Sequence, residues 1–238
     1  DVMDHRGDGE DSLSDESLPA EVGERTRPPA PLVHEVVRAE GEKELRRPVA
    51  SLFWSGLAAG LGICASVQGE AFLHMHLPDA TWRPAVESIG YTFGFLIVVL
   101  GRLQLFTENT ITAILPLLRR RTSRMLRRTG RLWGVVLGAN LLGTFLFALL
   151  STKLGLSPDE HIAAFLSIST ELLQKSPGEV LALAVPAGFL IAAVVWMLPS
   201  AEGSQAFVIF ALTYLIAVGG FTHVIAGSTE LFILVFEG

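Results

Sequence analysis

The stretches LQLFTENT, residues 103–110, and GFTHVIAGSTELFILVFEG, residues 220–238, interrupt two hydrophobic segments of this chain. The first stands inside the long apolar run 88–118. The second places His223 at the end of a hydrophobic helix, before a Gly/Ser break and another short apolar run. Within a bilayer, unwound backbone is tolerated only where it lines a cavity or is buried in protein. The two interruptions therefore predict two broken membrane helices that face a common pathway.

The composition indicates that lipid, not water, is the solvent of most of the chain. Half of the 238 residues are hydrophobic, 18% are charged and the mean hydropathy is +0.47. Soluble domains have about 25% charged residues, and an apolar stretch of roughly 20 residues is enough to cross a membrane. We predict an all-α membrane protein whose spans are 49–72, 85–118 (broken), 132–152, 179–200 and 204–236 (broken).

The acidic charge is concentrated before the first span. Residues 1–48 hold 13 of the 24 acidic and 7 of the 18 basic residues, so residues 49–238, the predicted transmembrane transport domain, are electrically neutral. The first 31 residues have few apolar side chains and are predicted to be disordered. Residues 32–47 are predicted to form an amphipathic helix on the membrane surface, and a solvated helix is the equal alternative.

Seven arginines between residues 119 and 131 predict the orientation of the chain in the membrane. Loops rich in Arg and Lys stay in the cytoplasm, so we expect this loop and the N-terminal tail to be cytoplasmic. Residues 158–174 then form an external amphipathic helix. A role for the arginines in binding lipid or nucleic acid is the weaker interpretation.

Several functional classes are excluded by composition and motif. The net charge is −6 and the pI is about 5.5, with no base-reading module, so we expect no nucleic-acid partner. We find no nucleophile with a base at plausible spacing, no metal-ligand cluster and no phosphate-binding loop. The sequence therefore predicts a protein that is not an enzyme and that needs no metal or other cofactor.

The order of these elements resembles the formate/nitrite transporter family. An intact span is followed by a broken span with LFT (105–107), a basic loop, two spans with VWM (195–197), and a broken span with GFTH (220–223). The resemblance runs from Val49 to the C-terminus. It implies an aquaporin-like fold of two inverted three-helix repeats, assembled as a homopentamer in the lipid bilayer of the inner (plasma) membrane. It also implies that small monovalent anions pass through one pore in each protomer.

That family has six spans, and this sequence contains five. The sixth span, which would return the C-terminus to the cytoplasm, does not follow Gly238, and the sequence begins with Asp1. We expect a trimmed chain, with a true five-span protein as the alternative.

The residue types in the two breaks suit a small acid. An anion cannot enter hydrocarbon without a large Born energy, whereas its neutral acid can. His223 is the one histidine within a span, and its ordinary pKa of about 6.5 allows proton exchange near neutrality. The hydroxyl of Thr107 can bond an anion or the imidazole, and Leu105 and Phe106 form an apolar constriction. By resemblance, these four positions match the family's central histidine, loop threonine and constriction residues.

Each of these residues also has a simpler interpretation. His223 can cap backbone carbonyls or pair with a neighbour in the bundle. Thr107 can be the N-cap of the helix that begins at Glu108, and Leu105 and Phe106 can be ordinary packing residues.

Charged residues near the breaks depart from the family pattern. Glu108 stands where the family usually has a small residue, and Arg102 and Glu230 add further charges. Because a buried charge needs a partner, we predict that Arg102 pairs with Glu108 or Glu230 across the repeat interface. Replacing Arg102 with Met is then expected to impair assembly.

Three further positions bear on the pathway. Gly227 and Gly188 stand where the family commonly has asparagines, which weakens a hydrogen-bond relay and places formate and nitrite in doubt as substrates. Lys175 is a candidate for the family's external lysine.

The sequence thus predicts a channel or proton-coupled transporter for small monovalent anions such as formate or nitrite, in which the central His223 protonates the substrate. One alternative is an aquaporin-like pore for neutral solutes. Another is a non-conducting membrane scaffold that acts through the acidic tail.

Overall fold

The protein is described by a computed structural model over residues 28–237, and all regular elements in this range are helices. The segment 1–27, most of the predicted disordered tail, lies outside the described residues. The elements are α2 (Ala30–Glu44), α3 (Val49–His76), α4 (Arg83–Leu100), α5 (Glu108–Arg119), α6 (Ser123–Thr152), α7 (Asp159–Leu173), α8 (Pro177–Met197), the short 3-10 helix η1 (Leu198–Ser200), α9 (Gln205–Val218) and α10 (Val224–Glu237).

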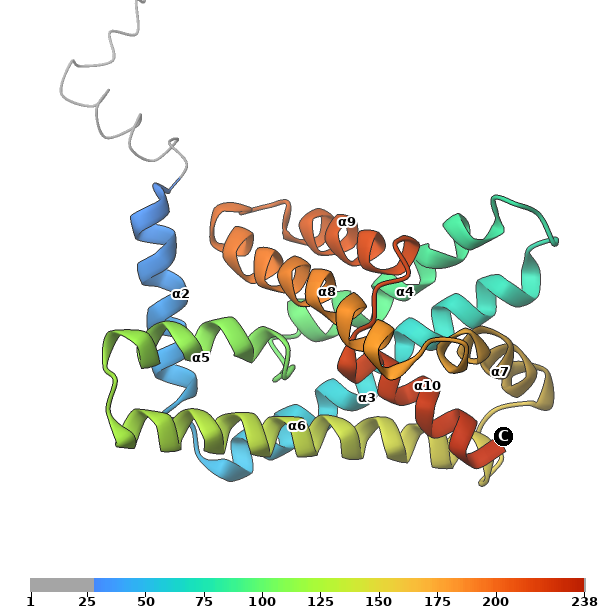
Figure 1. Cartoon of the computed structure of the whole chain (residues 1–238), viewed down its shortest axis with the longest axis horizontal. Helices are drawn as coiled ribbons and strands as arrows, with labels where there is room; N and C mark the ends of the chain where they lie inside the picture. Colours follow the sequence, from blue (N-terminus) through green and yellow to red (C-terminus); the bar gives the residue numbers. More distant parts are fainter. Residues whose placement is uncertain (1–27, 238) are drawn as a thin grey trace, which may run out of the picture.

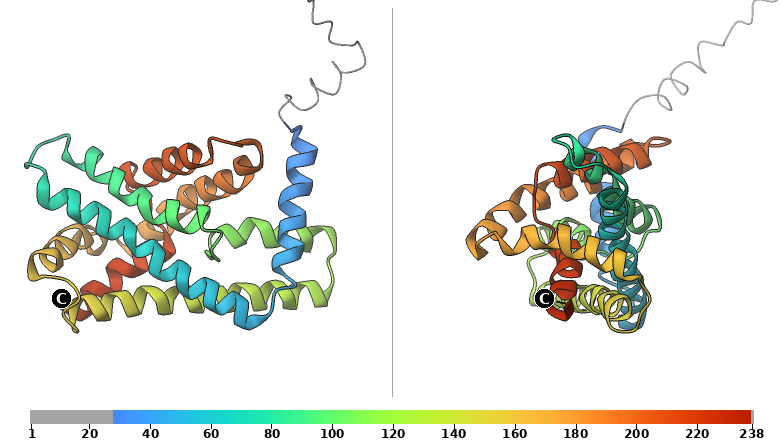
Figure 2. Two further views of the ribbon diagram at one scale, coloured as in Figure 1. Left: turned by 180° about the vertical axis from the view of Figure 1, so that it is seen from behind. Right: turned by 90° about the vertical axis from the view of Figure 1, so that its right-hand side faces the viewer.

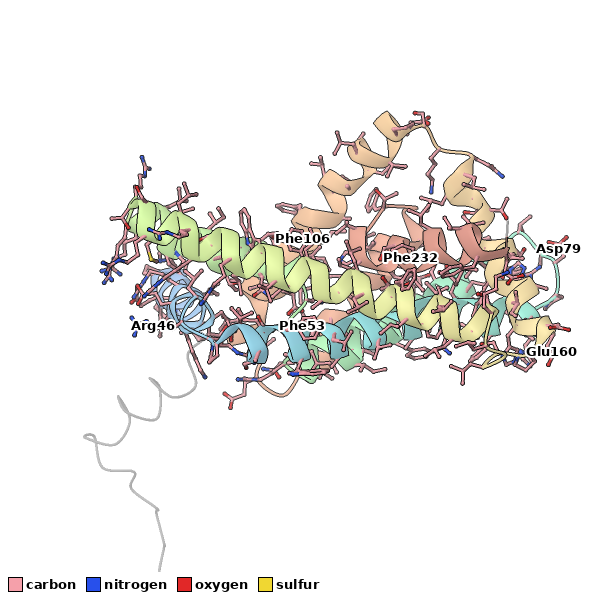
Figure 3. The ribbon with its side chains drawn as sticks, turned by 90° about the horizontal axis from the view of Figure 1, so that it is seen from below. Arg46, Phe53, Asp79, Phe106, Glu160 and Phe232 are labelled. Atoms are coloured by element: carbon pink, nitrogen blue, oxygen red, sulfur yellow. The ribbon has the colours of Figure 1, made fainter. Side chains whose placement is uncertain are left out.

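The described chain contains four helices that are long and apolar enough to cross a membrane. They are Val49–His76, Arg83–Leu100, Ser123–Thr152 and Pro177–Ser200, and α9 is a shorter apolar helix. In Figure 1 α6 runs along the long axis of the molecule, while α3 and α4 form an antiparallel pair beside it. Charged residues gather at the ends of this bundle. Figure 3 shows Arg46 at one end, Asp79 and Glu160 at the other, and the aromatic side chains of Phe53 and Phe106 between them.

Glycines allow α3 to pack closely on both of its neighbours. A Cβ at Gly60 would overlap the backbone of Asn140 in α6, and a Cβ at Gly90 in α4 would overlap the backbone at Gly69. Small residues of this kind let membrane helices approach until their backbones touch. The close approach of α3 and α6 occurs at Gly60, whereas Gly138 has open space around it.

Two helices outside the bundle mark its opposite ends. Figures 1 and 2 show α2 standing across the axis of α6 at one end and α7 at the other. Helix α2, which covers most of the amphipathic segment 32–47, packs Val33 and Val37 against Val195 of α8. Its other side is charged, and Arg38 bonds Glu35. The hydrogen bond from Arg38 holds the pKa of Glu35 below its ordinary value.

The arginine-rich segment is helical, so the prediction of a loop over residues 119–131 is wrong. The connection between α5 and α6 is short, and α6 begins at Ser123 with the hydroxyl of Thr122 accepting the backbone N–H of Met125. Arginine is a good helix former, and a capped helix can extend past the apolar span. Four of the seven arginines, those at 124, 127, 128 and 131, therefore belong to the first turns of α6.

Both interruptions are real breaks, and they begin in the same way. After α4, the N–H of Leu103 bonds the carbonyl of Val98 and the N–H of Arg102 bonds that of Val99. After α9, Phe221 bonds Ile216 and Gly220 bonds Ala217 in the same pattern. This is the Schellman motif, which needs a left-handed residue after the C-cap. That residue is Gly220 (φ 63°) in the second break and, less usually, Arg102 (φ 50°) in the first.

Asn140 of α6 holds the first break in place. Its Oδ1 accepts the N–H of Phe106 at 2.9 Å, and its Nδ2 donates to the carbonyls of Gly56 at 2.7 Å and Gln104 at 2.9 Å. The side chain is fully buried. One amide thus bonds two peptide groups that have left the helix and also ties them to α3.

We predict that Asn140→Asp destabilises the protein by about 2 kcal/mol or more, because a carboxylate cannot donate to the two carbonyls and each buried group without a partner costs about 1–3 kcal/mol. Thermal unfolding in detergent measures the effect. Thr129→Val is the matched control in the same helix, since the Thr129 hydroxyl is buried without a hydrogen-bond partner among the described residues. Equal stability of the two variants would contradict the role of Asn140.

Candidate functional site

Thr107 and His223 occupy equivalent places in the two breaks. Thr107 directly precedes α5, and His223 directly precedes α10. The N-terminal ends of these helices meet in the middle of the molecule, and the helices run from there in opposite directions (Figure 1). Oγ1 of Thr107 lies 2.8 Å from Nε2 of His223. The structure therefore joins the two polar residues that the sequence places in separate breaks.

The hydrogen bonds of His223 define where its proton is. Nδ1 accepts the backbone N–H of Ala226 at 3.2 Å, so Nδ1 carries no proton. In a neutral imidazole the proton is then on Nε2, which donates it to Oγ1 of Thr107. The hydroxyl proton of Thr107 is left free to bond an acceptor that enters the site.

The contact with Thr107 matches one of the simpler interpretations of His223, a pair with a neighbour in the bundle, and it is compatible with a role in a pathway. His223 caps a backbone N–H of α10 and not a carbonyl, and it bonds a residue of the other repeat. Thr107 stands at the N-cap position of α5, but its side chain does not cap that helix.

The pair is enclosed by apolar side chains. His223 is 4% exposed, and the ring of Phe95 packs edge-on against it with centroids 5.0 Å apart. Leu105 is fully buried in the same core. Phe106 is half-buried and packs edge-on against Trp133 of α6. Leu105 and Phe106 thus both pack in the core beside the pair. Their role as an apolar constriction stays a prediction.

A cavity of about 320 Å³, here named the α7 vestibule, leads to His223 from the α7 end. Among the sequence-predicted site residues, Lys175, Gly227 and Glu230 line it together with His223. The other ionisable side chains in its wall are Glu70, His74, Glu87, Tyr91 and Glu171.

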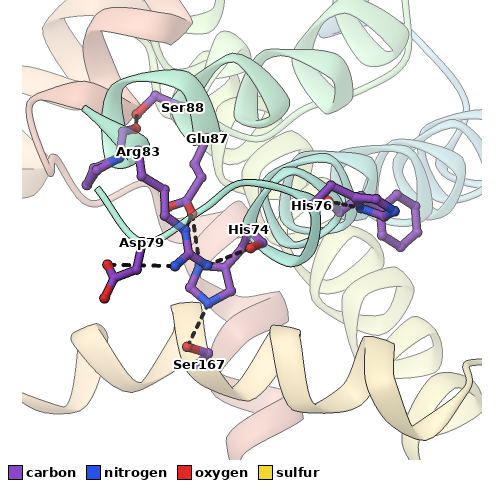
Figure 4. A network of polar contacts seen from close by, with 9 residues as sticks. His74, His76, Asp79, Arg83, Glu87, Ser88 and Ser167 are labelled. Carbon is purple, nitrogen blue, oxygen red and sulfur yellow. Dashed lines mark hydrogen bonds and ion pairs between the residues drawn. The ribbon is translucent and has the colours of Figure 1, made fainter. Parts of the chain in front are cut away.

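A polar network fastens one wall of the α7 vestibule (Figure 4). Nδ1 of His74 lies 2.9 Å from Oε1 of Glu87, and Nε of Arg83 donates to the same oxygen. The other ring nitrogen of His74 lies 3.0 Å from the hydroxyl of Ser167 in α7. The network therefore ties α3, α4 and α7 together, and it neutralises the charge of Glu87.

A second cavity of about 420 Å³, the α2 vestibule, opens at the other end. Arg102 and Glu108 line it, together with Gln104, Asn109 and residues of α2. Oε1 of Glu108 is buried and has no hydrogen-bond partner among the described residues. The α7 vestibule thus reaches His223, and the α2 vestibule reaches Glu108, the residue that follows Thr107.

The predicted ion pair of Arg102 is wrong. No carboxylate of the described chain lies within 4.0 Å of its guanidinium, and Arg102 is exposed. Glu230 cannot be its partner, because it lines the α7 vestibule while Arg102 lines the α2 vestibule. Glu108 shares the α2 vestibule with Arg102, but the arginine, in its left-handed turn, is exposed and makes no ion pair with it.

Gly188 and Gly227, the two glycines that the sequence places near the pathway, differ in position. Gly188 is exposed on α8 and lines neither vestibule. Gly227, in contrast, lines the α7 vestibule, and a Cβ there would meet open space.

Sequence reasoning missed two residues. Asn140 was visible as a single asparagine within an otherwise uncharged, apolar span. Glu70 was visible as an acidic residue inside the predicted span 49–72, and it lines the α7 vestibule.

Two interrupted helices whose half-helices meet head to head in a bundle of apolar spans define a multi-pass membrane protein of the channel and transporter class. A sequence profile described as formate/nitrite transporter matches residues 31–238. The chain belongs to this family, which is one of transporters and not of enzymes.

Individual relatives agree with this assignment. The chain is 42% identical over 206 residues to the inner membrane protein YfdC of Escherichia coli strain K12, covering 87% of this chain and 66% of the relative, so it spans just under two thirds of that protein. Two solved structures share the fold at lower identity. A pentameric formate channel with formate bound has a TM-score of 0.68 and 18% identity, covering 79% of this chain and 75% of that one. An FNT family ion channel has a TM-score of 0.73 and 19% identity, covering 84% and 82%.

We predict that Arg102→Met leaves assembly and melting temperature unchanged, because no ion pair is lost. Arg102→Gly is expected to stabilise the protein by about 1 kcal/mol, since glycine adopts a left-handed conformation without the penalty that other residues incur. Size-exclusion chromatography and thermal unfolding in detergent test both variants. Loss of the oligomer in Arg102→Met would restore a structural role for the charge.

Proposed function

We propose that this protein is a membrane channel or proton-coupled transporter that passes small monovalent anions, such as formate or nitrite, or their neutral acids, between the two vestibules. The observation that carries the proposal is the 2.8 Å contact of Thr107 with His223 at the meeting point of α5 and α10. In this proposal a solute that moves between the vestibules passes this pair, because His223 lines one vestibule and Glu108, the residue after Thr107, lines the other.

The electrostatics of the meeting point favour an acid. The N-terminal end of a helix has a partial positive charge and unpaired N–H groups, and two such ends converge on Thr107 and His223. The free hydroxyl proton of Thr107 can bond one oxygen of a carboxylate or nitrite. The apolar neighbours Phe95, Leu105 and Phe106 exclude water, so a hydrated anion loses its shell and a neutral acid is favoured.

The assembly state is part of the proposal. The solved structure with a TM-score of 0.68 is described as a pentameric channel, and this chain has large apolar side chains on its outside that suit contact with lipid or with further copies. Four examples are Trp54 at 66%, Leu181 at 72%, Phe189 at 72% and Phe207 at 70% exposed. A homopentamer with one pathway in each protomer accounts for them.

The arginines near the start of α6 indicate the orientation of the protein in the membrane. The arginines at the start of α6 lie at the α2 end of the molecule, where Arg119 pairs with Glu35 of α2 at 3.6 Å. Cytoplasmic segments are rich in arginine. The α2 vestibule and the N-terminus are therefore assigned to the cytoplasm, and the α7 vestibule to the outer face.

Formate uptake into proteoliposomes, measured at acidic and neutral outside pH, tests the function. We expect uptake that rises with acidity in the wild type, and a loss of at least about tenfold at every pH in His223→Asn, which is close in size to histidine but does not reproduce both ring contacts. Exposed Glu160→Gln is the control and is expected to transport normally.

Uptake no greater than in empty liposomes at either pH would reject formate as a substrate. Uptake that is the same at both pH values and is unchanged in His223→Asn would favour a pore for neutral solutes.

A further inference from the structure

One face of α10 connects the centre of the pathway to the α7 vestibule. His223, Gly227 and Glu230 are spaced i, i+4 and i+7, so they lie one above another on the helix, and all three line the cavity. The rise of 1.5 Å per residue places Glu230 about 10 Å along the axis from His223. Between them Gly227 has no side chain, and the space that a Cβ would enter is open. A small solute can therefore move from Glu230 to His223 along a bare strip of helix.

His223 is a poor source of a proton for that solute. Its single proton is on Nε2, and a neutral imidazole does not release it as an acid near neutrality. To act as an acid, His223 would first need a second proton on Nδ1. That nitrogen already accepts the N–H of Ala226, so protonation would break the bond and leave the first turn of α10 without its cap.

The walls of the α7 vestibule contain more acid than base. Glu87 is neutralised by Arg83. Among the described residues that line the cavity, Lys175 is the one permanent cation, and it faces the remaining carboxyl groups of Glu70, Glu171 and Glu230. None of these three carboxyl groups has an ion pair within 4.0 Å in the described chain. From α6, Lys153 pairs with Glu237 at 2.9 Å and is not available to them.

An excess of carboxylates has a consequence for a monovalent anion. Like charges in a cavity with low-dielectric walls repel it over the whole depth of the cavity, whereas the neutral acid feels no such barrier. A carboxyl group in the wall can also exchange protons with a carboxylate in the cavity at little cost in free energy, because Glu titrates at about 4.3 in water, within the range of simple carboxylic acids.

We infer that Glu230 is the proton-transfer group of the pathway, which protonates the substrate anion in the α7 vestibule before it reaches a permanently neutral His223. In this step the Glu230 carboxylic acid gives its proton to the substrate carboxylate or nitrite, so that a glutamate anion and the neutral acid are formed. A hydronium ion from the solution at the mouth of the vestibule then returns a proton to Glu230, and a water molecule is left. Glu70, from the facing helix α3, adds a second negative charge that keeps unprotonated substrate out.

This inference depends on the proposed function, and the experiment separates the two. Initial formate influx into proteoliposomes is measured from outside pH 5 to pH 7.5 for wild type, Glu230→Gln, Glu230→Asp and Glu160→Gln. Glutamine keeps the size of Glu230 but cannot carry the proton. Aspartate keeps the carboxyl group, and Glu160→Gln removes one negative charge from an exposed position of α7 outside the cavity.

We expect Glu230→Gln to lose the acid-stimulated part of the influx by at least about tenfold, a cautious threshold below the roughly 10²–10⁴-fold that a positioned proton donor contributes. Glu230→Asp should retain a pH-dependent influx, and Glu160→Gln should match the wild type. All variants are checked for oligomeric state and melting temperature, so that a folding defect is recognised.

Three results would overturn the inference while leaving the proposed function intact. The first is a wild-type pH profile in Glu230→Gln. The second is a higher influx at neutral pH with the acid stimulation kept, which would make Glu230 only a repulsive charge. The third is an equal loss in Glu230→Gln and Glu230→Asp at every pH, which would make it a structural residue. Absence of influx in the wild type would instead reject both proposals.

Discussion

Peptide groups that leave a helix inside a bilayer have no water to bond, and the rest of this structure depends on how they are bonded by protein. Both breaks first use the same Schellman turn, which returns N–H groups to the end of the preceding helix. The first break then relies on Asn140, whose one amide bonds Phe106, Gln104 and Gly56. The second break relies on His223, which bonds the N–H of Ala226. Because these bonds are made, the half-helices can start at the centre of the molecule.

The same bonds create the site. With Nδ1 committed to the backbone of α10, the imidazole can present only its Nε2–H to Thr107. The two half-helices are thereby joined at their positive ends, where a negatively charged solute is stabilised. Close helix packing at Gly60 and Gly90 holds the outer frame of spans rigidly around this point. The side chain of His223 thus both bonds the backbone of the second break and forms the contact with Thr107.

Charge is distributed differently in the two vestibules. The α2 vestibule is lined by Arg102, Lys43 and carboxylates of α2, so cations and anions are mixed there. The α7 vestibule has carboxyl groups from several helices and Lys175 as its permanent cation. The electrostatic field therefore differs between the two vestibules. This asymmetry comes from residues that are far apart in the sequence and is not visible in the net charge of the spans.

The sequence alone was sufficient for the class of protein, the two breaks and the residues within them, because hydrophobic length, charge and local motifs are properties of neighbouring residues. Thr107 and His223 were placed in the two breaks in this way. Contacts between distant segments needed the tertiary structure. The sequence could not show that Arg102 and Glu230 line opposite cavities, that Gly188 lies on an exposed face, or that Asn140 bonds a break 34 residues away. Sequence analysis also placed the seven arginines in a loop, because a cytoplasmic loop and a helix that extends beyond the membrane are both rich in arginine. Which polar groups meet, and which cavity a charge faces, is decided by the packing of helices, because only packing sets the direction and surroundings of a side chain.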